Sequence, residues 1–300
     1  MNRHGLSPAR KAIALNRRTL LSAACALPLS ALPLGRSAAG AEGALPLRNL
    51  GLEHLDVLVP DTARSALFYM QVFDAPLHEQ EFRGTIRYFV LLGDLPEDRQ
   101  VGYIAIGDVF DRPIQIGHYC ALAEDVDLDA IGEELVAAGY PPPGGGFGMI
   151  PDPDGLELQL FSPPRSGLVG AATKSPLEHH TGGLFRPVGM DHILLRVSDL
   201  DQALEYYRFV YGEGLERRDP NVADKVWLEL PEDTRIGLQP VPPGRDPWIE
   251  RYGIKVEPFD HDAAVAGLRE LGAEVLSGPD EPEVVTFKDN YDITLQVTSR

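Results

Sequence analysis

The sequence of 300 residues predicts an α+β protein built from two tandem domains that repeat one another. Two observations carry this prediction. One motif occurs twice: an aspartate stands seven residues after a histidine, and an aromatic pair begins seven residues after the aspartate. In addition, apolar alternation typical of strands is interrupted by helical patterns in both halves. The hydrophobic content of 44% and charged content of 24% are those of a globular chain rather than a disordered one.

The repeat sets the expected domain boundaries. The two copies of the motif begin at His54 and His192, 138 residues apart. Near the other end of each repeat, the Leu-Gln-Leu at 158–160 matches the Leu-Gln-Val at 295–297, 137 residues apart. Such near-constant spacing predicts duplicated domains joined by a Gly- and Pro-containing linker with little periodicity. The expected ranges are 52–163 for the first domain, 164–188 for the linker and 189–299 for the second domain.

Strand and helix patterns alternate in a fixed order within the first repeat. His54 and Asp56 alternate with apolar residues in the first strand, so they share the face opposite to the apolar one. Asp61 is expected to cap the first helix, and Gly139 to end the second. The order strand, helix, three strands thus occurs twice in each domain and four times in the chain. The further elements expected are strands near 76–82, 87–92, 101–107 and 116–123, a helix at 127–138, and strands near 147–150 and 156–161.

The charge of the chain excludes two classes of partner. Its net charge is −18, and such a surface repels the phosphates of nucleic acids and of anionic lipids. The two cysteines cannot form a disulfide framework. We therefore expect no nucleic acid as partner.

The first 41 residues differ from the rest because they hold six basic residues and no acidic one. Arg17 and Arg18 precede an apolar run at 20–34, which is too short to span a bilayer. The Ala-Gly-Ala at 39–41 is typical of a cleavage site. The arginine pair resembles a twin-arginine export signal, and an ordinary secretory signal is the alternative. We expect removal of residues 1–41 and a periplasmic or secreted protein without a membrane anchor.

The repeated motif, its aromatic pairs and the Asp-Pro-Asp-Gly at 152–155 resemble the vicinal oxygen chelate superfamily. This superfamily includes glyoxalases, extradiol dioxygenases and bleomycin-resistance proteins. The resemblance covers nearly all of residues 52–299. It implies that paired βαβββ units form a curled, half-open barrel of mixed β-sheet in each domain. It also implies a divalent metal that chelates two neighbouring oxygens of a small-molecule substrate.

The superfamily's metal ligands lie on the first, fifth and last strands of one domain. In the first domain these positions hold His54, His118 and Gln159. The third ligand is usually Glu, and two histidines with one carboxylate are the typical set for iron(II). Gln159 departs from this set because an amide oxygen coordinates more weakly. Glu157 lies two residues earlier on the same strand and is the alternative third ligand. The implied metal is Fe(II) or Mn(II), and a metal-free protein stays open.

The second domain departs further from the superfamily's ligand set. The three positions hold His192, Arg251 and Gln296. A guanidinium stays protonated and cannot ligate a metal, but it can bind a carboxylate or phenolate. We therefore expect no metal there, and these three residues are candidates for binding substrate.

The resemblance implies three candidate functions. The tandem architecture favours an exported, metal-dependent enzyme, most like an extradiol dioxygenase, acting on a small catechol-like or vicinal-oxygen substrate. Glutamine at both last-strand positions favours a metal-free protein that binds or sequesters a small molecule, as in the bleomycin-resistance type. A glyoxalase-like isomerase or lyase is the third, although strand 101–107 offers no histidine or acid as a fourth ligand. No catalytic acid or base is assigned.

Overall fold

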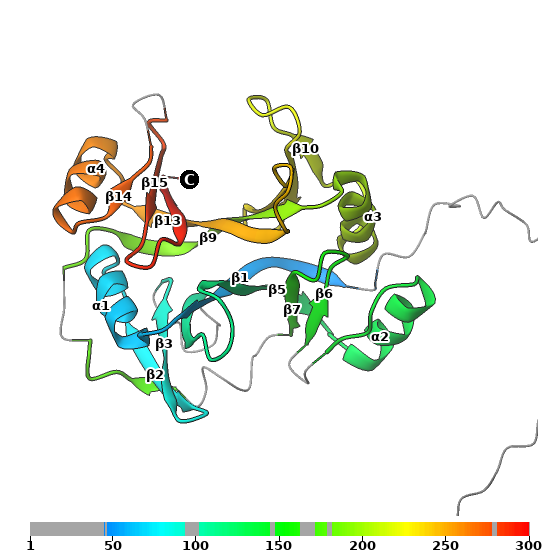
Figure 1. Cartoon of the computed structure of the whole chain (residues 1–300), viewed down its shortest axis with the longest axis horizontal. Helices are drawn as coiled ribbons and strands as arrows, with labels where there is room; N and C mark the ends of the chain where they lie inside the picture. Colours follow the sequence, from blue (N-terminus) through cyan, green and yellow to red (C-terminus); the bar gives the residue numbers. More distant parts are fainter. Residues whose placement is uncertain are drawn as a thin grey trace, which may run out of the picture. The chain divides into compact units, whose positions relative to one another are not determined.

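The computed structural model describes Leu45 and residues 47–93, 102–144, 148–162, 172–178, 182–277 and 281–299. These residues form two mixed eight-stranded sheets with four helices (Figure 1), which confirms the tandem α+β fold. The expected export signal at residues 1–41 lies outside the described residues. No helix in the described ranges has the length and apolar character needed to cross a membrane.

The first sheet is built from residues 48–174. Its elements are β1 (Arg48–Val59), α1 (Thr62–Val72), β2 (Leu77–Phe82), β3 (Thr85–Leu91), β4 (Tyr103–Asp108), β5 (Gln115–Glu124), α2 (Leu128–Ala137), β6 (Met149–Pro151), β7 (Glu157–Phe161) and β8 (Thr173–Lys174). The strand order is β6-β7-β5-β1-β4-β3-β2-β8. The central strand β1 pairs parallel with β4 and antiparallel with β5.

The second sheet repeats this arrangement. Its elements are β9 (Arg186–Val197), α3 (Leu200–Tyr211), β10 (Glu216–Arg218), β11 (Val226–Leu230), β12 (Thr234–Pro240), β13 (Trp248–Glu257), α4 (His261–Glu270), β14 (Glu274–Val275), β15 (Val284–Lys288) and β16 (Thr294–Thr298). The strand order is β10-β11-β12-β9-β13-β16-β15-β14. The central strand β9 pairs parallel with β12 and antiparallel with β13, as β1 does with its neighbours.

The segment between the domains differs from the expected linker. Thr173 and Lys174 form β8, which pairs with β2 and adds an edge strand to the first sheet. In addition, β9 begins at Arg186, three residues before the expected start of the second domain. A two-residue strand has no period-two pattern, so sequence periodicity does not reveal it.

Aspartates begin all four helices. In each case the side chain accepts a hydrogen bond from a backbone N–H of the first turn, which would otherwise lack a partner. Asp61 caps α1 in this way, as expected, and Asp199 caps α3 at the equivalent position. Each of these helices follows a strand from the middle of its sheet: α1 follows β1, α2 follows β5, α3 follows β9 and α4 follows β13.

The two faces of the first sheet differ in chemistry. Leu55, Val57 and Ile104 point to a continuous apolar core that also contains residues of the second domain. The alternate residues of the same strands point the other way, and there His54, Asp56 and Tyr103 are buried. The candidate site therefore lies on the face opposite to the main core.

Candidate functional site

A β-bulge places an acid beside the first candidate ligand. The pairing of β1 with β5 shifts register between Leu52 and His54, so Glu53 is an extra residue in the β1–β5 ladder. Its Oε2 lies 2.5 Å from His54 Nδ1, and both side chains are buried. Because a carboxylate accepts here, Nδ1 carries the proton and the acceptor lone pair of the ring is on Nε2.

The second candidate ligand meets the first. His54 Nε2 and His118 Nε2 are 3.3 Å apart. His118 lies opposite Asp56 in the β1–β5 ladder, and its Nδ1 is 3.5 Å from Asp56 Oδ2. Arg87 forms an ion pair with the other oxygen of Asp56. Both imidazoles are thus held by carboxylates behind them, while their Nε2 atoms converge.

This convergence fits a metal. Two protein nitrogens bound to one divalent ion at about 2 Å each lie about 3 Å apart, close to the observed separation of the two Nε2 atoms. The carboxylates of Glu53 and Asp56 match the usual partners of metal-bound histidines. The donor set of the first domain therefore suits a divalent cation.

Gln159 lies in the same row of the sheet as His54. Tyr103, His54, Cys120 and Gln159 are successive cross-strand partners on β4, β1, β5 and β7. Gln159 is only 1% exposed. The register of β7 thus places Gln159 two strands away from His54, on the last strand of the expected ligand set.

Glu157, the alternative third ligand, stands at the first position of β7 and pairs with Pro151 of β6. It is half-buried and lines a cavity of about 780 Å³ whose other walls include Trp248 and Glu250 of the second domain. It therefore lies at the strand end, where the first and second domains meet.

Cys120 is a further side chain beside the candidate ligands. Within the described part of the chain, one group of histidine, cysteine and acidic ligand atoms lies within 4.8 Å of one another: Glu53, His54 and Cys120. The thiol is fully buried and its Sγ is 3.6 Å from the carbonyl oxygen of Ala121. Because the Glu53 carboxylate already accepts a hydrogen bond from His54 Nδ1, we assign Glu53 to orientation of the imidazole rather than to metal binding.

An apolar wall adjoins the histidines. The ring of Tyr103 stacks on His54 with 4.4 Å between ring centroids. Behind it lies a small cluster, separate from the main core, formed by Phe89, Leu91, Tyr103 and Ala105. All four residues are buried, so the two histidines lie against an apolar and aromatic part of the sheet.

The second domain repeats the bulge but not the ligands. Asp191 is the extra residue in the pairing of β9 with β13, and its Oδ2 lies 2.5 Å from His192 Nδ1. His192, Gly253 and Gln296 form one row, as His54, Cys120 and Gln159 do. A Cβ atom on Gly253 would lie 2.4 Å from the imidazole of His192, so this ring fills the place of a side chain.

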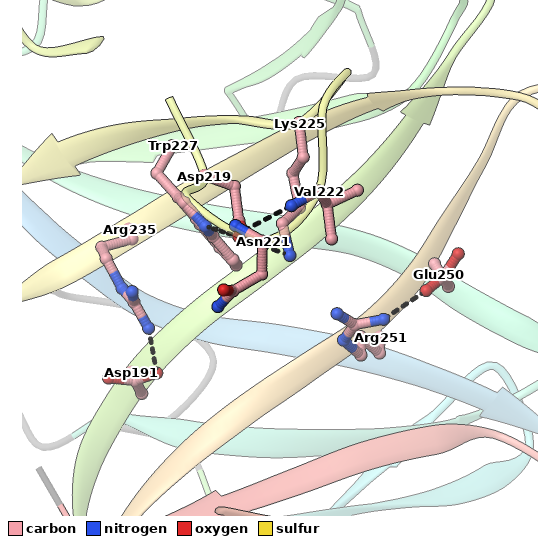
Figure 2. A network of polar contacts seen from close by, with 9 residues as sticks. All are labelled: Asp191, Asp219, Asn221, Val222, Lys225, Trp227, Arg235, Glu250 and Arg251. Carbon is pink, nitrogen blue, oxygen red and sulfur yellow. Dashed lines mark hydrogen bonds and ion pairs between the residues drawn. The ribbon is translucent and has the colours of Figure 1, made fainter. Parts of the chain in front are cut away.

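Positive charges replace the second histidine and the aromatic wall (Figure 2). Arg251 stands where the first domain has His118, and its guanidinium pairs with Glu250. Arg235 stands on β12 opposite His192, lies 4.5 Å from the ring centroid of Trp227, and donates to Asp191 at 2.9 Å. The metal-ligand geometry of the first domain is thus not reproduced.

Burial and the two guanidiniums set the protonation of His192. Burial lowers the pKa of His192, and the positive charges of Arg235 and Arg251 lower it further, although the hydrogen bond with Asp191 opposes them. Burial disfavours ionisation of Asp191, yet its contacts with His192 and Arg235 hold the pKa of this carboxyl well below its usual range. The pair is therefore a neutral imidazole donating from Nδ1 to an ionised carboxylate.

Comparison with known proteins agrees with this fold. Residues 192–298 match the family model of the Glyoxalase-like domain. The 2,3-dioxygenase LapB from Pseudomonas sp. KL28 superposes with a TM-score of 0.62 at 16% identity, covering 84% of this chain and 92% of that one. The Mn(II)-bound glyoxalase from Novosphingobium aromaticivorans gives 0.56 at 18% identity, with 84% and 82% covered.

A third similar structure is an extradiol ring-cleaving dioxygenase from B. fuscum, with a TM-score of 0.59 at 13% identity, covering 85% of this chain and 72% of that one. At such identities the likeness establishes a shared fold. The family model matches the second domain, although the convergent histidines belong to the first.

Proposed function

We propose that the chain is a two-domain member of the vicinal oxygen chelate superfamily and a metal-dependent enzyme whose metal centre lies in the first domain. The observation that carries this proposal is the 3.3 Å approach of His54 Nε2 to His118 Nε2, with a buried carboxylate behind each ring. Gln159, or Glu157, completes the ligand set. The metal is Fe(II) or Mn(II), and the activity best supported is extradiol-type cleavage of a small catechol-like substrate.

Residues around the two histidines prepare the site. Glu53 keeps the proton of His54 on Nδ1, so that Nε2 presents its lone pair to the centre. Asp56 orients His118 in the same way, and the ion pair with Arg87 holds the Asp56 side chain in place. A bound divalent metal would supply a Lewis acid that holds two neighbouring oxygens of the substrate.

The apolar surroundings of the histidines support a substrate with a planar ring. Tyr103 stacks on His54, and Phe89 and Leu91 pack behind it, all three being buried. Such surroundings suit a catechol-like ring better than the small polar substrate of a glyoxalase-like isomerase or lyase. Neutral Gln159 in place of a carboxylate favours the second candidate function, a metal-free protein that sequesters a planar molecule.

Metal content of the purified full-length protein distinguishes the two functions. We expect about half an equivalent or more of iron or manganese per chain, measured by elemental analysis after anaerobic purification. The double variant His54→Ala/His118→Ala should lose it, and the matched variant His192→Ala should retain it. Absence of bound metal in the wild type at saturating Fe(II) and Mn(II) would favour the sequestering protein. Equal loss in His192→Ala would contradict the assignment to the first domain.

We propose also that the protein is exported by the twin-arginine route. Arg17 and Arg18 before an apolar run support this. Because the export receptor reads the guanidinium pair, changing both residues to Lys should retain uncleaved precursor in the cytoplasm, as seen by fractionation and immunoblotting. Normal periplasmic accumulation of this variant would indicate the secretory route instead.

A further inference from the structure

The second domain gathers positive charge on the face that corresponds to the metal site of the first. Arg235 and Arg251 flank His192, and their side chains are 13% and 19% exposed. Both are partly buried but reachable from solvent. In a chain of net charge −18, a cluster of positively charged side chains is unusual and indicates a binding role.

Several polar atoms in this cluster lack partners. Among the described residues, His192 Nε2, Arg235 Nε, Arg251 Nε and Asp191 Oδ1 are buried without a hydrogen-bond partner. The His192 side chain is only 4% exposed. Buried polar groups of this kind cost free energy unless something satisfies them, and an anion or other bound molecule is a common explanation.

The unsatisfied atoms specify a ligand with two kinds of group. The two guanidinium nitrogens are donors and carry charge, so they require an acceptor that is negative. The other two atoms are acceptors: Asp191 is ionised, and the Nδ1–H of His192 already donates to it, which makes Nε2 an acceptor. The ligand must therefore also donate a hydrogen bond.

The two arginines differ in how closely they are paired. Arg235 is balanced by Asp191, and Lys225 by Asp219 at 2.6 Å. Glu250, by contrast, is shared between Arg251 and Arg196, and the charge of Glu281 also acts on Arg251. Within the part of the chain that the structure describes, Arg251 therefore has no carboxylate partner of its own.

From these observations we propose that the second domain holds a metal-free binding site for a small hydroxy acid. Its carboxylate lies between Arg235 and Arg251, and its hydroxyl donates to His192 Nε2. Arg251 in place of the second histidine excludes a metal and supplies the charge that a carboxylate needs. The site is independent of the metal centre assigned to the first domain.

The test compares three matched small molecules on the full-length protein. Glycolate has both groups, acetate lacks the hydroxyl, and glycolamide lacks the charge. Binding is followed by the fluorescence of Trp227, which contacts Arg235 and His192, in a Trp248→Phe background that leaves it as the single tryptophan. We expect saturable binding of glycolate, with acetate about 10-fold weaker or more and glycolamide without measurable binding. Equal binding of glycolate and glycolamide would overturn the proposal.

Variants then locate the site. Arg251→Gln and Arg235→Gln should each weaken glycolate binding about 10-fold or more, whereas Arg245→Gln, an exposed arginine on Trp248, should not. His192→Phe should abolish the preference for glycolate over acetate. If an arginine variant does not fold, the comparison of glycolate, acetate and glycolamide on the protein with both arginines intact still tests the proposal. Loss of glycolate binding in His54→Ala/His118→Ala would place the ligand at the metal centre and overturn the proposal.

Discussion

Tyr69 of the first domain donates a hydrogen bond of 2.9 Å to Asp289 of the second. The equivalent tyrosine of the second domain, Tyr207, donates one of 3.1 Å to Asp152 of the first. Each tyrosine belongs to the aromatic pair that marks the repeat, and Asp152 begins the Asp-Pro-Asp-Gly turn. The motifs that identify the repeat therefore hold the two domains together.

A second tyrosine completes each contact. Tyr252 lies 2.7 Å from the hydroxyl of Tyr69, and Tyr119 donates to Tyr207 at 3.0 Å. All four tyrosines are fully buried, and burial raises the pKa of each. The hydroxyls are therefore protonated donors over the whole range in which the protein is used.

Removal of one of these hydroxyls should destabilise the protein. Tyr207→Phe leaves Asp152 with its backbone hydrogen bonds from Asp154 and Leu156 but without its side-chain donor. We expect a loss of about 1–3 kcal/mol in the free energy of unfolding, measured with denaturant. The matched control is Tyr211→Phe on the same helix, because the Tyr211 hydroxyl is buried without a hydrogen-bond partner among the described residues. Similar losses in both variants would mean that the contact with Asp152 contributes nothing specific.

The burial of Asp152 should make stability depend on pH. Burial raises the pKa of Asp152 from 3.8 to about 6, although hydrogen bonds from Leu156, Tyr207 and Asp154 oppose the shift. Between these values the folded state binds more protons than the unfolded state. Stability contributed by this group is therefore full below about pH 4, falls as the pH rises and is lost above about pH 6, a change of about 3 kcal/mol.

Asp152→Asn removes this titration. The fall in unfolding free energy between pH 4 and pH 6 should be smaller in this variant than in the wild type, as measured by denaturant unfolding at several pH values. Burial raises the pKa of Asp289 as well, so part of the fall should remain. The exposed Asp201→Asn serves as control. An unchanged slope in Asp152→Asn would show that this carboxyl is ionised in the folded protein throughout the range.

Glu53 offers a sharp test of the metal centre because the second domain contains its equivalent. Glu53→Gln weakens the hydrogen bond that orients His54 through Nδ1. It should lower metal affinity about 10- to 100-fold, which is the usual effect of removing a carboxylate that orients a metal-bound histidine. Asp191→Asn makes the same change beside His192 and should leave metal affinity unaltered. Metal titration monitored by calorimetry compares the two. An equal effect of both variants would contradict a centre confined to the first domain.

Gln159→Glu should restore the carboxylate of the superfamily's ligand set. The variant should bind Fe(II) or Mn(II) more tightly and melt at a higher temperature with metal than without it. Without metal it should be less stable than the wild type, since an unpaired carboxylate would be buried at a position 1% exposed. Gln296→Glu, the equivalent change opposite Gly253 in the second domain, should show no such response to metal.

Glu157→Gln separates the alternatives for the third ligand. Abolished metal binding in this variant, with little change in Gln159→Glu, would assign the position to Glu157. A metal-dependent rise in melting temperature no greater than about 1–2 °C in both variants would indicate a metal-free protein.

Much of the candidate site follows from local sequence patterns. Strand alternation places His54 and Asp56 on one face, and counting from the Asp-Pro-Asp-Gly turn reaches Gln159, in agreement with the observed β5–β7 register. Glu53 escapes such reasoning because alternation assigns it to the opposite face. Only the bulge, which depends on pairing with β5, brings it to His54.

The contacts between the domains could not be predicted in the same way. Tyr119 and Tyr252 lie in apolar strands, where an aromatic residue signals burial but not a partner. Their hydrogen bonds join residues 88 and 183 positions apart in the chain. Such pairs are fixed by the packing of one repeat on the other, which no local pattern encodes.

The reciprocal tyrosine contacts have the symmetry of a homodimer fused into one polypeptide. In a twofold dimer the same patch serves both partners, and any substitution appears in both copies at once. Fusion removes that constraint, because each half is encoded separately. One half can keep the histidine pair while the other replaces His118 by Arg251 and Tyr103 by Arg235 at the equivalent positions. The interface stays twofold, whereas the chemistry of the two sheet faces is free to diverge.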